Sequence, residues 1–274
     1  MSNLQAADIG LGQTILRRAA ISPEKPALTF EGVTLSFAEL SDRVRRMVAV
    51  LRTGGVSAGD RVGYIGLNHP VFLEMLYACG CLGAVFVPLN FRLTGPEMRF
   101  IANDAGISVM VADNMLRPLV DSERDNLQCT RYISAEADAD NWEPLEPLMA
   151  AATPIESSAR VDGDDVAFIM YTSGTTGLPK GAMLTHGNIF WNSINVCFGE
   201  DGLSDTTLTC APLFHIGGLN VTTLLSLGKG IEVVLLRSFD AGEVLALIEK
   251  HKVTTMFGAP TMFLMMVQHE SFAT

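Results

Sequence analysis

A polar loop between two apolar stretches carries the residue types that bind phosphate groups. The segment from Tyr171 to Gly181 reads Tyr-Thr-Ser-Gly-Thr-Thr-Gly-Leu-Pro-Lys-Gly, and the apolar run before it predicts a buried strand. Glycines let backbone N–H groups turn toward a ligand, hydroxyl groups donate to phosphate oxygens, and Lys180 adds one compact positive charge. The segment therefore predicts a site for an oligophosphate.

This loop differs from the phosphate loops that lead into a helix. Those loops place Ser or Thr directly after a Gly-Lys pair, whereas here Pro179 precedes Lys180 and Gly181 follows it. The next residues predict a strand, so we expect the loop to join two strands and to bind phosphate without a helix dipole. The alternative is an ordinary turn rich in Ser, Thr and Gly, and the length of the contiguous motif favours phosphate binding over it.

His215 is a second candidate, and the residues around it leave its role open. It stands in the apolar segment Leu213-Phe-His-Ile216 and two glycines follow, a setting typical of a packed core histidine. A serine hydrolase is not favoured, because no Gly-x-Ser-x-Gly segment surrounds Ser173. A metal site is not favoured either, since the five histidines show no His-x-x-x-His spacing.

Several segments together resemble the AMP-forming adenylate superfamily, which includes acyl-CoA synthetases, luciferases and the adenylation domains of peptide synthetases. The segment from Tyr171 to Gly181 is similar to the signature of that family. Further matching segments are Gly59-Asp-Arg-Val62, Leu82-Gly-Ala84, Val87-Pro-Leu-Asn90, Ala182-Met-Leu-Thr-His-Gly-Asn188, Pro212-Leu-Phe-His-Ile-Gly-Gly218 and Gly258-Ala-Pro-Thr261. The resemblance runs from about residue 10 to the end, and it covers only the N-terminal portion of acyl-CoA synthetases of the fatty-acid–CoA ligase type.

The resemblance implies ATP-dependent activation of a carboxylic acid, with a fatty acid as the expected substrate. In the family a carboxylate attacks the α-phosphorus of ATP and pyrophosphate leaves. The thiol of coenzyme A then displaces AMP to give an acyl-CoA thioester. ATP and coenzyme A are therefore the implied substrates, and Mg²⁺ is the implied cofactor. Chemistry of this kind depends mainly on positioning and charge neutralisation.

By the same resemblance each candidate residue receives an expected role. Lys180 neutralises part of the leaving pyrophosphate, and His215 borders the adenylate and the path of the thiol. Ile216 contacts the nucleotide, and Thr172 both belongs to the nucleotide site and offers its hydroxyl to Mg²⁺. The residues expected to hold the pyrophosphate are Ser173, Gly174, Thr175, Thr176 and Gly177, and those expected to line the acyl pocket are Gly258, Ala259 and Pro260.

Short apolar strands alternate with amphipathic helices along most of the chain. This alternation predicts an α/β fold with mainly parallel sheets flanked by helices. Glu31-Gly32 predicts a hairpin turn, and Ser36 with Glu39 predicts a helix that begins with a capping box. The helix expected after Pro260 is apolar on most sides, which indicates that it needs packing partners.

The resemblance also implies that the N-terminal domain is divided into two subdomains. Residues of about 56–210 are expected to form a first α/β subdomain that contains the phosphate loop 171–181. Residues 11–55 and 211–274 are expected to form part of a second α/β subdomain. Residues 135–159 are rich in Ala, Glu, Asp and Pro, and they are expected to form an exposed connection with one short helix.

Composition argues against several classes of function. The net charge is -11 and no basic tract exists, which argues against nucleic-acid binding. The five cysteines show no zinc spacing, and we expect them to be reduced thiols in a cytoplasmic protein. The N-terminus lacks an apolar signal segment, and the longest uncharged stretches are interrupted by Gly, Pro or polar residues, so no transmembrane segment is expected.

Full-length members of the family continue well past residue 274. They contain a Glu that supports magnesium, an Asp that holds the ribose hydroxyls, and a mobile C-terminal domain with a lysine that drives adenylation. We therefore expect an incomplete N-terminal domain without the C-terminal domain, and no measurable adenylation by this chain alone. The alternative is a non-catalytic remnant that binds nucleotide, or that binds a partner or a second copy through the apolar helix after Pro260.

Overall fold

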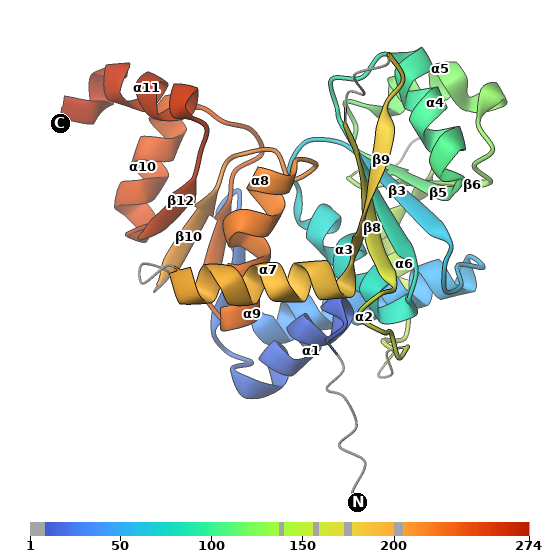
Figure 1. Ribbon diagram of the computed structural model, residues 1–274, viewed down its shortest axis with the longest axis horizontal. Coiled ribbons are helices and arrows are strands. Elements are labelled where there is room, and N and C mark those ends of the chain that lie inside the picture. Colours follow the sequence, from blue (N-terminus) through green and yellow to red (C-terminus); the bar gives the residue numbers. More distant parts are fainter. Residues whose placement is uncertain (1–8, 137–139, 156–158, 173–176, 200–204, 274) are drawn as a thin grey trace, which may run out of the picture.

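Two sheets lie side by side in the protein, and helices cover them (Figure 1). The computed structural model describes residues 9–136, 140–155, 159–172, 177–199 and 205–273. Most neighbouring strands are parallel, and the antiparallel pairs are β1 with β2 and β8 with β9. The predicted α/β fold with mainly parallel sheets is therefore confirmed.

The larger sheet has seven strands and forms the right-hand part of Figure 1. In spatial order they are β7 (Glu143–Pro144), β6 (Arg131–Ser134), β5 (Ile107–Ala112), β3 (Arg61–Ile65), β4 (Val85–Leu89), β8 (Val166–Thr172) and β9 (Lys180–Thr185). Every residue of β4 is buried, as expected for a central parallel strand covered on both faces. The helices that connect the strands of this sheet are α3 (Pro70–Leu82), α4 (Gly95–Ala105), α5 (Arg117–Glu123) and α6 (Leu145–Ala151), with a short 3₁₀ turn at Arg124–Asn126.

The smaller sheet has five strands. In spatial order they are β12 (Thr255–Phe257), β10 (Thr206–Thr209), β11 (Glu232–Leu235), β1 (Pro26–Phe30) and β2 (Val33–Ser36). Its helices are α7 (His186–Gly199), α8 (Ile216–Gly218), a π-helical turn (Leu219–Thr223), α9 (Leu224–Lys229), α10 (Ala241–His251) and α11 (Pro260–Gln268), and a 3₁₀ turn at Glu270–Ala273 follows. The remaining two helices are α1 (Leu11–Ile21) and α2 (Phe37–Thr53).

Local signals in the N-terminal segment are confirmed. Glu31 and Gly32 have positive φ angles of 47° and 82°, the conformation that a tight β-hairpin turn requires. The Ser36 hydroxyl accepts from the Glu39 backbone N–H, and the Glu39 carboxylate accepts from the Ser36 N–H at 2.7 Å. This capping box begins α2, whose apolar face then enters the core.

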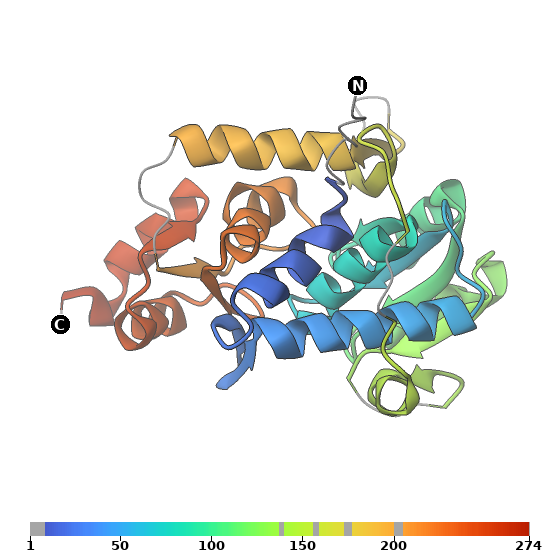
Figure 2. The same cartoon turned by 90° about the horizontal axis from the view of Figure 1, so that it is seen from below.

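One hydrophobic core joins the two sheets. It contains Leu28 and Val233 from the smaller sheet, Val62 and Phe168 from the larger sheet, and Phe72 from α3. Helices α1, α2 and α7 run along the same side of both sheets, as the view from below shows (Figure 2). Burial of apolar surface therefore fixes the position of one sheet relative to the other.

The boundary between the two predicted subdomains is wrong for one strand. We placed residues up to about 210 with the first subdomain, but Thr207–Thr209 of β10 pair with β11 and β12 of the smaller sheet. The physical reason is the helix that precedes β10. Helix α7 crosses beneath both sheets and carries the chain from β9 into the second sheet (Figure 1).

The described part of residues 135–159 contains more secondary structure than the exposed connection that we expected. The short helix is confirmed as α6, but Glu143–Pro144 also adds a strand to the larger sheet. Trp142, Leu145 and Met149 are buried, because they pack against the sheet and against α2. Strand β6 and helix α5, which precede this region, were not predicted.

The C-terminal helix α11 keeps a large apolar surface open. Phe263, Leu264, Met265 and Val267 are all between 43% and 57% exposed, whereas Met266 is buried against α10 and β10. The expectation that this helix needs packing partners agrees with that exposure. Among the described residues, no helix combines the length and apolar character that crossing a membrane requires.

Candidate functional site

The phosphate segment forms the end of the β8–β9 hairpin, as predicted. Thr172 is paired directly with Lys180, so this pair closes the base of the loop. Side chains of directly opposed residues in an antiparallel pair lie on the same face of the sheet. Ser173, Gly174, Thr175 and Thr176 lie outside the described residues, and their predicted contacts with phosphate stay predictions.

Lys180 is available to an anionic ligand. Its side chain is exposed, and no ion pair joins it to any other residue that the structure describes. Gly177, on the same loop, is exposed and has a φ angle of 98°, a conformation that side chains rarely adopt. The hairpin therefore presents one amine and one backbone turn that only glycine adopts without strain.

Tyr171 adds a side-chain hydrogen bond between the end of this hairpin and helix α4. The Tyr171 hydroxyl donates to the Asp104 carboxylate on α4 at 2.6 Å. Burial, and then the neighbouring carboxylate, raises the pKa of Tyr171 above its usual value. Gly181 lies beneath the Tyr171 ring, since a Cβ at that position would stand only 3.1 Å from a ring carbon. This glycine thus allows close contact between the two strands of the hairpin.

His215 is exposed, so the packed core setting that its neighbours suggested is wrong. It caps the N-terminus of α8, where its Nδ1 accepts from the Gly217 backbone N–H at 3.2 Å. In the neutral imidazole the proton then resides on Nε2, which is left as a hydrogen-bond donor. Ile216, the expected nucleotide contact, is 40% exposed beside it.

The two glycines after His215 are required by packing. A Cβ on Gly217 would stand 2.5 Å from the Phe257 ring, and one on Gly218 would stand 2.4 Å from the Pro212 carbonyl oxygen. Phe257 ends β12 and directly precedes Gly258, Ala259 and Pro260. The expected acyl-pocket segment therefore begins against the turn that carries His215, and its role in a pocket stays a prediction.

Asn68 is a residue that sequence reasoning missed. It is buried after β3, and its Nδ2 donates to the carbonyl oxygens of Ala211 and Leu236, both at 3.0 Å. Its Oδ1 accepts from the Leu213 backbone N–H at 2.9 Å. One amide thus links the larger sheet to the segments that follow β10 and β11, and it fixes the chain two residues before His215. A polar residue just past the carboxyl end of a parallel strand was the available signal.

The hairpin and the His215 turn lie at the same edge of the molecule. Phe91 follows the carboxyl end of β4, and its ring packs edge-on against Phe214, with centroids 5.4 Å apart. Strand β4 pairs with β8, whose carboxyl end leads into the phosphate loop. In open α/β sheets ligands bind at the carboxyl ends of the strands, which is where these two candidate groups are.

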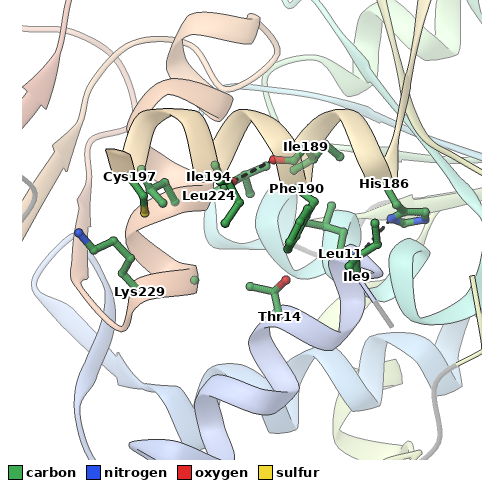
Figure 3. Close-up of a pocket in the computed structure, with 13 residues that line it drawn as sticks. Ile9, Leu11, Thr14, His186, Ile189, Phe190, Ile194, Cys197, Leu224 and Lys229 are labelled. Atoms are coloured by element: carbon green, nitrogen blue, oxygen red, sulfur yellow. Dashed lines mark hydrogen bonds between the residues drawn. The ribbon is translucent and has the colours of Figure 1, made fainter. Parts of the chain in front are cut away.

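A separate apolar cavity of about 230 Å³ lies between α1, α7 and α9 (Figure 3). Leu11, Phe190 and Leu224 contribute apolar side chains, and Cys197 and Lys229 lie toward one end. None of the residues predicted for the phosphate, nucleotide or acyl sites lines it. A cavity of about 150 Å³ lined by apolar side chains is large enough for benzene, so this one can hold part of an apolar ligand.

Comparison with known proteins gives one family and consistent relatives. The model of the family described as "AMP-binding enzyme" matches residues 15–274. A feruloyl-CoA synthase from Amycolatopsis sp is 44% identical over 95% of this chain and 50% of its own length. A long-chain-fatty-acid–CoA ligase from Mycobacterium tuberculosis is 32% identical over 96% of this chain and 52% of its own.

The fold has a similar solved counterpart. The inhibitor-bound N-terminal domain of FACL13 from Mycobacterium tuberculosis superposes with a TM-score of 0.89 at 31% identity, over 97% of this chain and 66% of that chain. The chain thus spans about half the length of the curated relatives that it matches.

Proposed function

Because the chain belongs to the AMP-binding enzyme family, we propose that it binds the phosphates of ATP at the β8–β9 hairpin and a carboxylic acid near His215. In this proposal it forms part of a ligase that converts the acid to an acyl-adenylate and then to a coenzyme A thioester. The exposed Lys180, opposite Thr172 at the base of a loop rich in glycine and hydroxyl groups, carries the proposal.

Three roles in the proposed reaction are assigned to groups of this chain. Lys180 attracts the phosphate oxygens and neutralises charge that builds up on the departing pyrophosphate. The Nε2–H of His215 donates a hydrogen bond to an oxygen of the acyl-adenylate. Mg²⁺ would neutralise further phosphate charge when it is bound. The Thr172 hydroxyl is the neutral oxygen that this chain offers to such a hard cation.

We further propose that the carboxylic acid carries an apolar group. The names of the relatives suggest two classes of such acids. The feruloyl-CoA synthase acts on an aromatic acid and the Mycobacterium ligase on long-chain fatty acids, as their names state. The cavity in Figure 3 favours the second class. Gly228, one of its lining residues, lies twelve positions after Ile216, which corresponds to about 18 Å at the α-helical rise per residue. Only a long chain whose carboxylate lies near His215 would extend that far.

Nucleotide binding tests the role of Lys180 directly. We expect Lys180→Met to weaken binding of MgATP about 10- to 100-fold, since a charge-assisted hydrogen bond contributes about 1.5–3 kcal/mol. Binding of AMP, which lacks the departing phosphates, should change less than about twofold. Lys25→Met is the matched control, because Lys25 is also exposed but lies before β1. Equal losses for ATP and AMP, or equal losses in both variants, would reject the assigned role.

The choice between the two acid classes calls for a competition assay with the same chain. We expect the palmitoyl-adenylate to bind more tightly than the feruloyl-adenylate. Leu224→Trp, which fills the cavity between α1 and α9, should remove that preference and leave binding of the feruloyl-adenylate unaffected. If the feruloyl-adenylate bound more tightly and Leu224→Trp changed neither affinity, the long-chain assignment would be wrong.

A second candidate function is nucleotide or partner binding without catalysis, and the exposed apolar face of α11 favours it. Carboxylate-dependent exchange of labelled pyrophosphate into ATP tests whether this chain catalyses adenylation by itself. We expect the 274-residue chain to bind ATP without supporting this exchange, because it corresponds to about half of the curated relatives. Robust exchange by the purified chain would show that these residues suffice for adenylation.

A further inference from the structure

The turn that carries His215 is closed at its base by two threonines. The chain leaves β10 at Thr209, passes through His215 and α8, and returns along the π-helical turn to Thr223. The Thr209 and Thr223 hydroxyl oxygens are 2.7 Å apart and buried. The Thr223 hydroxyl is also 2.7 Å from the Gly218 carbonyl oxygen, to which it donates. A hydroxyl has one proton, so Thr209 donates to Thr223 and Thr223 donates to Gly218.

The two hydrogen bonds of Thr223 lie where the helical hydrogen-bonding pattern changes. Thr223 follows Gly218 by five residues, the spacing of a π turn, whereas α8 before it and α9 after it are α-helical. A π turn accommodates one residue more than an α turn, which rotates the preceding segment by about 100° relative to the following helix. The direction of the His215 side chain relative to α9 therefore depends on this turn.

Two buried polar side-chain atoms lie within the π turn. Asn220 Oδ1 and Thr222 Oγ1 are buried and have no hydrogen-bond partner among the described protein atoms. Leaving such atoms unpaired destabilises the folded state. The π turn also contains one residue more than a regular α-helical turn. Single π turns occur frequently at functional sites, and this one directly follows α8, whose N-terminus His215 caps.

From these observations we infer that Thr223 is a positioning residue. Its hydroxyl holds the Gly218 carbonyl in the π register and thereby directs His215 toward the ligand. The inference rests on the proposed function for the part that concerns nucleotide binding. Thr223 itself is buried, and in this arrangement it acts through the backbone of α8.

The test compares Thr223→Val with Thr207→Val in the 274-residue chain. Thr207 pairs with Ser226 at 2.7 Å, a similar buried hydroxyl pair between β10 and α9. That pair has no bond to the Gly218 carbonyl, so it provides the matched control. The readouts are the NMR signals of the His215 ring, assigned with His215→Asn, and the affinity for AMP.

We expect Thr223→Val to shift the His215 signals and to weaken AMP binding about tenfold, the equivalent of one hydrogen bond. Thr207→Val should leave the His215 signals in place and AMP affinity within about twofold. Thr223→Ser, which retains the hydroxyl, should restore both readouts. If Thr223→Val does not fold, Thr223→Ala gives the same comparison, since it removes the hydroxyl without placing a methyl group against the Gly218 carbonyl.

Changes in the His215 signals that are no larger in Thr223→Val than in Thr207→Val would overturn the inference. The same conclusion would follow if Thr223→Ser behaved like Thr223→Val. Should the unmodified chain fail to bind AMP, the proposed function would be wrong, and the NMR signals would still decide whether Thr223 directs His215.

Discussion

The two halves of the candidate site are built in opposite ways. The β8–β9 hairpin presents exposed residues, among them Thr172, Gly177 and Lys180, and its described side-chain hydrogen bond to α4 is that of Tyr171. The His215 turn presents an exposed imidazole on a backbone that is buried at Gly217 and Gly218. Asn68, Thr223 and Phe257 all contact that backbone or its flanks.

Because of this difference, substitutions in the two halves should have different effects. The hairpin contains its proposed ligand-binding groups within one contiguous segment, so substitutions there should change affinity more than stability. The His215 turn depends on partners from β10, from β12 and from the segment after β3. Substitutions of those partners should change stability first and affinity as a consequence. The following predictions test this contrast, from the largest expected effect to the smallest.

The largest effect is expected at Asn68. Asn68→Ala removes three side-chain hydrogen bonds and leaves buried backbone groups of Ala211, Leu213 and Leu236 unpaired. We expect the free energy of unfolding in urea to fall by about 3–5 kcal/mol. Asn192→Ala, which loses one bond to the Asn220 carbonyl, should cost about 1 kcal/mol. Similar costs for the two variants would contradict the role of Asn68 as the link between the sheets.

A pH effect of intermediate size is expected at His69, which follows Asn68 and caps α3. Burial lowers the pKa of His69 from 6.5 to about 4, despite the Glu136 carboxylate at 3.9 Å. Below about pH 6.5 the unfolded chain binds a proton that the folded chain does not bind. The contribution of His69 to stability is therefore complete above pH 6.5 and is lost as pH falls toward 4.

Urea denaturation at pH 7 and pH 4.5 measures this loss. We expect the unmodified chain to lose about 2–3 kcal/mol more than His69→Asn between these two values. Asn retains a side-chain acceptor for the Val71 backbone N–H but does not titrate. Parallel losses in the two proteins would show that His69 does not contribute to the acid sensitivity.

The smallest effect on stability is expected in the hairpin. Tyr171→Phe removes the hydrogen bond to Asp104, which is exposed, so we expect a loss of only about 0.5–1 kcal/mol. Hydrogen exchange of the β8 and β9 amides should nevertheless become faster than exchange elsewhere in the larger sheet. Asp104→Asn, which retains an acceptor but removes the charge, should show a weaker form of the same change. A loss as large as that of Asn68→Ala would remove the contrast between the two halves.

Local sequence patterns were reliable wherever neighbouring residues decide the structure. The Glu31-Gly32 turn, the Ser36–Glu39 capping box and the strand–loop–strand form of the phosphate segment are all confirmed. Errors arose where distant contacts decide the structure. Residues 143–144 gain a strand only because β6 lies beside them, and β10 joins the smaller sheet only because α7 carries the chain across.

The amino-acid sequence by itself was enough to predict a phosphate loop, because glycines, hydroxyls and one amine stand within a few consecutive residues. Only the tertiary structure decided that His215 is exposed and how its turn is held. Asn68 and Ala211 are separated by 143 positions in the chain, and their hydrogen bond exists only after two sheets have packed together. Exposure and hydrogen-bond partners are set by that packing, and no local pattern of residues specifies them.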